Sequence, residues 1–233
     1  GILRRKESTK YSDPAEKRRG SGRLFTEGAS FFSGKCGILG KTGTKGADHG
    51  MELRELLEIG PGLTALIGGG GKTTLMYHLA SELRQQGTVL VCTTTKIWPP
   101  AHLRVCAEEG TLREELRRRG IACAGMPAEQ GKLTAPAIDG WETMADFVLV
   151  EADGSAGRPF KAHADWEPVL PEERQATVLV MGADGFGKPI SRMAHRPELY
   201  ARLAGATEDR EVTPELAARV VRLVGLHDRV FLN

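Results

Sequence analysis

A glycine-rich stretch between a strand-like and a helix-like segment constrains this chain most: residues 68–74 read GGGGKTT. Residues 63–67 before it are a short apolar run. Residues 73–86 after it carry leucines four positions apart and end at Gly87, which predicts a helix. Glycines let backbone N–H groups approach phosphate oxygens, and a helix N-terminus favours negative charge. The stretch therefore predicts a phosphate-binding loop.

The loop departs from the full phosphate-loop pattern at one position. That pattern has a glycine five residues before Gly71, where this chain has Leu66, so we expect a shorter or differently folded start. Lys72 would reach the terminal phosphates and the Thr73 hydroxyl would ligate Mg²⁺. A glycine-rich turn with an incidental lysine is the alternative. The Gly-Lys-Thr-Thr sequence at a strand–helix junction argues against it.

Short apolar strands alternate with helix-like segments along the rest of the chain. The strands are expected at 88–92, 147–150, 177–181 and 229–232, and the helices at 112–119, 197–203 and 214–223. Fully apolar strands between helices are typical of a mostly parallel sheet covered on both faces. Residues 51–233 are therefore expected to form an α/β domain with a three-layer, P-loop NTPase-like fold.

Two acidic residues follow the apolar strand at 147–150, as in a Walker B strand. Glu151 and Asp153 are two positions apart, so both can point to one side of the strand end. One would hold Mg²⁺ through water and the other would polarise an attacking water. We assign the metal to Thr73 and Asp153. A surface pair in a loop is the alternative, which the apolar character of the strand disfavours.

Two further groups complete the candidate site. Hydroxyls and an ammonium follow the strand at 88–92, where a parallel sheet places its ligand crevice, although a simple polar strand exit is equally compatible. A long glycine-punctuated loop after Asp153 is a candidate switch or substrate loop. His195, at a helix start, is more compatible with a cap or surface residue. The catalytic, nucleotide-binding and substrate-loop residues expected from the sequence are Asp153 and Glu151; Gly68, Gly69, Gly70, Gly71, Lys72, Thr73, Thr74, Thr94, Thr95 and Lys96; and Arg158, Lys161 and His163.

Composition excludes several function classes. There is no apolar run of the roughly 18–20 residues that a membrane span needs, and no secretory signal, so we expect a cytoplasmic protein. The aromatic content of 6% argues against a base-stacking nucleic-acid surface. The four cysteines form no C-x-x-C pair, and Cys92 and Cys123 are expected in the core.

Residues 1–50 differ from the rest of the chain. They carry eleven basic and five acidic residues and ten of the 29 glycines, without helix or strand periodicity. This composition is typical of a disordered basic tail. Because Met51 opens an amphipathic segment, we also consider residues 1–50 to be upstream, non-native sequence.

The motifs taken together resemble the YqeC family, accessory proteins of selenium-dependent molybdenum hydroxylases. The resemblance covers about residues 51–233 and rests on GGGGKTT at 68–74, TTTKIWPP at 93–100, VEADGSAGRPFKAH at 150–163, WEPVLP at 166–171 and HRPE at 195–198. It implies a nucleotide-binding protein that helps to mature the selenium-containing cofactor of a client hydroxylase. It also implies a C-terminally truncated domain, because in relatives the last strand continues into an Asn-Lys-x-Asp-like segment and further helices.

Three functions therefore compete. The first is a maturation factor that hydrolyses ATP or GTP with Mg²⁺ and whose nucleotide state switches residues 153–163. The second is a small-molecule kinase of the P-loop type, with Arg158 and Lys161 binding the acceptor. The third is a nucleotide-sensing scaffold with little turnover.

Overall fold

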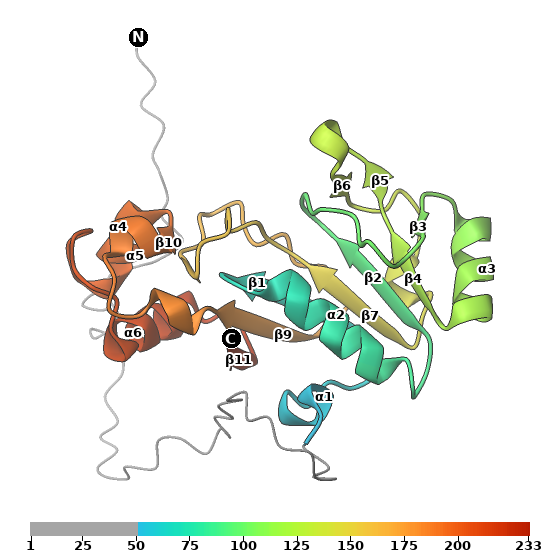
Figure 1. Cartoon of the computed structure of the whole chain (residues 1–233), viewed down its shortest axis with the longest axis horizontal. Coiled ribbons are helices and arrows are strands. Elements are labelled where there is room, and N and C mark those ends of the chain that lie inside the picture. The colour runs from blue at the N-terminus through green and yellow to red at the C-terminus, as the bar shows by residue number, and fades with distance from the viewer. Residues whose placement is uncertain (1–50) are drawn as a thin grey trace, which may run out of the picture. The chain divides into compact units, whose positions relative to one another are not determined.

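The computed structural model describes residues 51–233 (Figure 1). The two interpretations of residues 1–50, a disordered basic tail and upstream non-native sequence, lie outside the described residues. The sequence predicts that residues 51–233 form one nucleotide-binding domain.

Seven parallel strands form the central sheet within residues 51–233, in the order β11-β9-β1-β7-β2-β4-β3. The strands are β1 (Gly62–Gly68), β2 (Val89–Thr93), β3 (Val105–Cys106), β4 (Ile121–Ala124), β7 (Phe147–Glu151), β9 (Arg174–Met181) and β11 (Arg229–Leu232). Two small two-stranded sheets pair β5 (Met126–Pro127) with β6 (Leu133–Thr134), and β8 (Phe160–Lys161) with β10 (Ala194–His195). The parallel sheet expected from the apolar strands is confirmed.

Helices cover both faces of this sheet, which makes three layers (Figure 1). The helices are α1 (Leu53–Leu56), α2 (Lys72–Leu83), α3 (Glu109–Arg119), α4 (Ile190–Met193), α5 (Pro197–Ala204) and α6 (Pro214–Val224), with 3₁₀ turns η2 (Glu129–Gly131), η3 (Trp141–Thr143) and η4 (Ala183–Gly185). On β7, Leu149 packs in the cluster that contains α2, whereas Val148 packs in the cluster that contains α3. Side chains alternate between the faces along a strand, so an apolar strand supplies both cores.

Two strands of the central sheet, β3 and β4, and all four strands of the two small sheets are not expected from the sequence. β4 carries the sequence Ile-Ala-Cys-Ala, whose alanines have low strand propensity. Its four residues are nevertheless buried, because β4 lies between β2 and β3 in the sheet. β3 has two residues and offers no pattern to detect.

The sheet order places the glycine-rich loop at the carboxyl edge of the sheet, between two neighbouring strands. β1 lies between β9 and β7, and Leu66 of β1 is paired with Glu151 of β7. The chain therefore leaves β1 and β7 at the same edge. Parallel α/β sheets bind ligands at this edge, so the two predicted motifs are brought together.

Two further sequence expectations concern burial and membranes. Cys92 and Cys123 are buried in the core, as expected, and burial raises the pKa of the Cys123 thiol to about 12. Among residues 51–233, no helix has the length and apolarity that crossing a bilayer requires.

Candidate nucleotide site

Glycine is required in the loop between β1 and α2 by backbone conformation and by close packing. Gly71 has φ = 98°, a left-handed conformation, and is the N-cap residue of α2. A Cβ at Gly69 would overlap the carbonyl group of Pro159. The first helical hydrogen bond runs from Leu75 N to Gly71 O (2.9 Å). The amides of residues 71–74 therefore have no acceptor within α2 and lie at the positive end of its dipole.

Two loop amides are engaged by neighbouring backbone. Gly69 N donates to Val180 O (2.7 Å), and Gly70 N donates to Pro159 O (3.3 Å). The same Pro159 carbonyl accepts from Gly182 N (3.0 Å). The segment that follows Asp153 therefore closes over the glycine loop.

Lys72 is buried, with 3% of its surface exposed, and it faces two carboxylates. Its Nζ donates to Gly68 O (2.7 Å) and lies 3.1 Å from Asp153 Oδ1 and 3.8 Å from Glu151 Oε1. Because a buried ammonium is costly without counter-charges, these contacts explain how the interior accommodates it. Lys72 therefore bonds to the start of the glycine loop through Gly68 O, and its ammonium is of the kind that binds a phosphate.

Thr73 and Glu151 are in direct contact. The Thr73 hydroxyl donates to Glu151 Oε2 at 2.7 Å. Burial raises the pKa of the Glu151 carboxyl, and nearby Asp153 raises it further, against the lowering effects of Lys72 and the Thr73 hydrogen bond. The sequence paired Thr73 with Asp153, whereas the hydroxyl is directed at Glu151.

Asp153 is fully buried and lies at the centre of the charged cluster. Its Oδ2 accepts from Gly68 N (2.9 Å) and lies 2.7 Å from His163 Nε2 and 3.4 Å from Lys161 Nζ. Burial raises the carboxyl pKa, but the His163 hydrogen bond and the charges of Lys72 and Lys161 outweigh it and lower the pKa to about 2. Asp153 therefore remains charged and connects the loop to the segment that follows it.

The three predicted substrate-loop residues differ in their exposure to solvent. Arg158 is exposed, whereas Lys161 and His163 are buried. Lys161 Nζ donates to Gly154 O (2.5 Å) and to Glu167 Oε2 (2.7 Å). Only Arg158 of the three presents its side chain to solvent.

The residues that follow β2 have other partners. Thr94 donates its hydroxyl to Val169 O (2.7 Å), and the Thr95 amide donates to the Thr93 hydroxyl (3.0 Å). Lys96 is exposed and lies 3.8 Å from the Glu129 carboxylate on the surface. Thr74, on α2, is also exposed.

Glu167 and Arg196 belong to the charged cluster although neither was among the site residues expected from the sequence. Arg196 Nε donates to Glu167 Oε1 (2.7 Å), and Glu167 in turn accepts from Lys161. Both lie in sequence stretches, WEPVLP and HRPE, that carried the family resemblance. From the sequence, Glu167 beside Trp166 looks like an ordinary loop residue. Its contact with the buried Lys161 depends on the fold and leaves no local signal.

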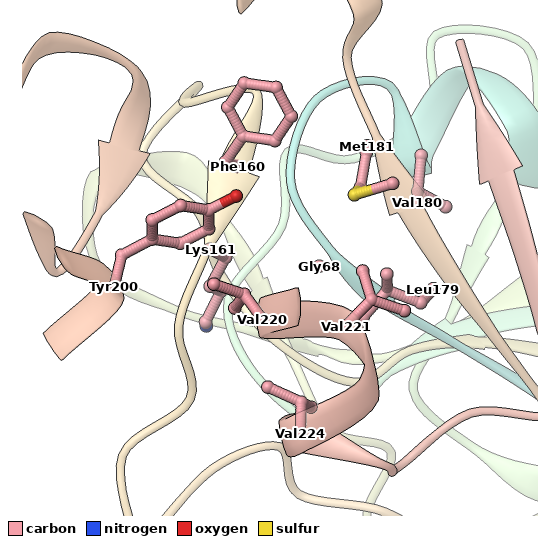
Figure 2. Close-up of a pocket in the computed structure, with 10 residues that line it drawn as sticks. All are labelled: Gly68, Phe160, Lys161, Leu179, Val180, Met181, Tyr200, Val220, Val221 and Val224. Carbon is pink, nitrogen blue, oxygen red and sulfur yellow. The ribbon is translucent and has the colours of Figure 1, made fainter. Parts of the chain in front are cut away.

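A small, mostly apolar cavity lies behind the loop, beside Gly68 (Figure 2). Valines of α6 and residues of β9 line it, together with Phe160, Lys161 and Tyr200. The Tyr200 hydroxyl is buried and has no hydrogen-bond partner among the described residues. An apolar lining does not suit a phosphate group. We therefore do not assign the phosphate to this cavity, but to the N-terminus of α2. Within residues 51–233, no group of three His, Cys, Asp or Glu side chains has metal-binding geometry.

The sheet, its two helical layers and the glycine loop define the class of this protein: a three-layer α/β protein with a P-loop NTPase-like fold. The chain belongs to the YqeC family, since the family model "YqeC protein" matches residues 64–198. The resemblance seen in the sequence is thereby confirmed.

A curated relative carries the same family name. The chain is 34% identical over 161 residues to "Uncharacterized protein YqeC" of Escherichia coli (strain K12), covering 64% of this chain and 63% of that protein. The match thus spans less than two thirds of the relative's length. No solved structure matches the chain significantly.

Proposed function

We propose that this chain binds a nucleoside triphosphate, ATP or GTP, with Mg²⁺ at the loop between β1 and α2, and hydrolyses it. The observation that carries the proposal is the 2.7 Å contact between the Thr73 hydroxyl and the Glu151 carboxylate at the start of α2. A hydroxyl and a carboxylate in contact, beside a lysine and helix-terminal amides, suit an Mg²⁺-bound triphosphate.

The donor atoms fit these groups. Mg²⁺ prefers oxygen ligands, and Thr73 and Glu151 supply a hydroxyl and a carboxylate oxygen. We therefore assign the metal to Thr73 and Glu151, in place of Thr73 and Asp153, because Asp153 is already paired with Lys72 and Lys161 and bonded to His163. A bound triphosphate would supply the transferable phosphoryl group and Mg²⁺ would offset its charge.

The remaining residues bind and orient. The amides of Gly70 and of residues 71–74 would hold phosphate oxygens, and Lys72 would leave Gly68 O to stabilise charge on the terminal phosphate. Asp153 pairs with the Lys72 ammonium and accepts from Gly68 N, so its main role in this proposal is to position the loop.

Nucleotide binding in this proposal requires the Pro159 segment to move. The Gly70 amide donates its hydrogen bond to the Pro159 carbonyl, so it is not free to donate to a phosphate oxygen. Residues 153–163 also contain Lys161 and His163, the partners of Asp153. A change in nucleotide state would therefore move these residues together, which supports the switch role expected from the sequence.

The family resemblance suggests the purpose of such a switch. We propose that the chain is a cytoplasmic accessory protein whose nucleotide cycle helps to mature a selenium-dependent molybdenum hydroxylase or to transfer its selenium-containing cofactor. The test compares the selenium content of the client hydroxylase produced with and without this protein. Equal selenium content would contradict this part of the proposal.

The chemistry is tested by titrating fluorescent ATP and GTP analogues and by measuring phosphate release at several Mg²⁺ concentrations. Glu151→Gln should lose Mg²⁺-dependent release by roughly 10²-fold, because it removes the charged oxygen beside Thr73. Glu173→Gln, an exposed substitution, is the matched control. Failure to bind either nucleotide would refute the proposal.

The same assay separates the alternatives. Phosphate release without an acceptor supports hydrolysis, and transfer that depends on an added metabolite supports the small-molecule kinase. Tight binding with negligible release supports the nucleotide-sensing scaffold. The kinase has the weakest structural support, since Lys161, one of its two expected acceptor ligands, is buried in an internal ion pair.

A further inference from the structure

Glu167 and Arg196 form an ion pair that extends into the buried charged cluster. Arg196 Nε donates to Glu167 Oε1 at 2.7 Å, and Lys161 Nζ donates to Oε2 at 2.7 Å. The Ala164 amide also donates to Oε1, at 3.3 Å. Both carboxylate oxygens are therefore engaged, one by β8 and the other by the residue that precedes α5.

Lys161 depends on Glu167 for charge balance. Its side chain has no exposed surface, and its ammonium lies 2.7 Å from Glu167 Oε2 but 3.4 Å from Asp153 Oδ2. Asp153 already pairs with Lys72 at 3.1 Å. Without Glu167, two buried ammonium groups would share Asp153 as the close carboxylate, and Lys161 would be drawn toward it.

Such a shift would act on the start of the glycine loop. Asp153 Oδ2, the oxygen nearest Lys161, also accepts from Gly68 N at 2.9 Å. An ammonium that moves onto this oxygen competes with the Gly68 amide. Glu167 is therefore placed to protect the bond between Asp153 and the loop.

Arg196 is held against Glu167 by an unusual backbone conformation. Its φ of 63° is left-handed, which costs a residue with a side chain about 1 kcal/mol or more. Its guanidinium lies 5.0 Å from the centre of the Trp166 ring and also donates to Glu167. The contacts with Trp166 and Glu167 thus offset the backbone strain and hold the Arg196 side chain against Glu167.

We propose that Glu167 is a positioning residue of the nucleotide site, acting through Lys161 on Asp153, and that Arg196 orients it. The effect on turnover rests on the proposed function. The effect on the Asp153–Gly68 bond does not, because that bond is present without nucleotide.

Amide hydrogen exchange at Gly68 tests the positioning directly, in the full chain. Glu167→Gln should speed this exchange about tenfold relative to wild type, as the loss of one charge-assisted hydrogen bond would. Glu167→Asp, which keeps the charge, should recover most of the protection. The exposed Glu173→Gln should match wild type.

Turnover provides the second readout. Glu167→Gln should lower kcat for phosphate release about tenfold with KM changed less than about twofold, the effect expected of a residue that supports a catalytic group. Glu167→Gln keeps the size of the side chain and removes its charge, so it tests the charge directly, whereas a packing role would be disturbed by the shorter Glu167→Asp and not by Glu167→Gln. If Glu167→Gln does not fold, Arg196→Lys replaces it, with an expected increase in Gly68 exchange of about threefold.

The outcomes separate the two proposals. If Gly68 exchange in folded Glu167→Gln equals that in Glu173→Gln, the positioning role is overturned. A loss in Glu167→Asp with none in Glu167→Gln also overturns it, because it would indicate packing and not charge. If Gly68 exchange rises as expected while wild type releases no phosphate, the positioning role stands and the proposed hydrolysis fails.

Discussion

Lys72 combines two demands that conflict in most side chains: it is buried, and it is charged. Its ammonium is compensated by Asp153 and Glu151, so the three groups stabilise one another only as a set. Removing one member leaves uncompensated charge in the interior. The residue that would serve a phosphate is thus also part of the core.

Lys72→Ala should therefore destabilise the fold as well as abolish nucleotide binding. We expect a loss of about 3 kcal/mol in unfolding free energy, because two carboxylates lose their shared cation. Urea denaturation measures it, with the exposed Lys188→Ala as control. A midpoint equal to that of the control would show that Lys72 is not part of a buried ion pair.

Asp153 should make stability depend on pH in a narrow acidic window. Its pKa is lowered in the folded state from the usual 3.8 to about 2. A lowered carboxyl pKa contributes stability that is complete above 3.8 and lost as pH falls to about 2, on the order of 2 kcal/mol.

Unfolding free energies between pH 5 and pH 2 check this contribution. Asp153→Asn should lose part of the acid dependence, whereas the exposed Glu172→Gln should keep it. An unchanged slope in Asp153→Asn would place the acid-sensitive group elsewhere.

Glu151 sets the expected pH dependence of turnover. Because burial raises its carboxyl pKa above the usual 4.5, Glu151 stays protonated to a higher pH than an ordinary glutamate. A protonated carboxyl is a poor Mg²⁺ ligand. Because this pKa is that of the free protein, kcat/KM for phosphate release should fall on the acid side with an apparent pKa above 4.5. A pH profile of kcat/KM that is flat down to pH 4.5 would contradict the assignment of Glu151 to the metal.

At the scale of elements, the segment that crosses the glycine loop is the part expected to move. The Pro159 carbonyl accepts from the amides of both Gly70 and Gly182, so exchange at these two amides indicates where the carbonyl lies. When nucleotide and Mg²⁺ are added, Gly182 should exchange faster as Pro159 leaves, whereas Gly70 should stay protected by phosphate. Hydrogen exchange measures both amides in one experiment. Unchanged exchange at Gly182 would show that Pro159 does not leave the loop.

Helix α6 illustrates a local signal that the fold preserves. Thr213 caps it by accepting from Leu216 N (3.3 Å), and Pro214 occupies its first turn, where a missing N–H is tolerated. Thr213→Ala should cost about 1 kcal/mol in urea unfolding, and Thr213→Ser should restore most of it. Equal stability of Thr213→Ala and wild type would show that the cap contributes little.

At the scale of the whole molecule, nucleotide binding should appear as global stabilisation. A ligand at 100 times its dissociation constant adds about 2.7 kcal/mol to folding, which for a chain of this size raises Tm on the order of 5–10 °C. Thermal unfolding with ATP or GTP and Mg²⁺ measures the shift. The shift should vanish in Glu151→Gln when Mg²⁺ is required for binding.

The sequence by itself determined the layer architecture, the parallel sheet and the place of the glycine loop. These features follow from local patterns: apolar strands of four or five residues, leucines at helical spacing, and glycines at a strand–helix junction. β4 was missed because Ala-Cys-Ala is a weak strand signal whose burial comes from its neighbours β2 and β3. Local propensity cannot report on neighbours that are remote in sequence.

Only the tertiary structure decided which charged groups meet. Glu151 and Asp153 are equivalent in the sequence, yet one contacts Thr73 and the other pairs with lysines and His163. Glu167 enters the same cluster from another loop. Ion pairs form between side chains that the sheet order brings within a few ångströms, and burial then strengthens them. The spacing of charges along the chain carries no information about those distances.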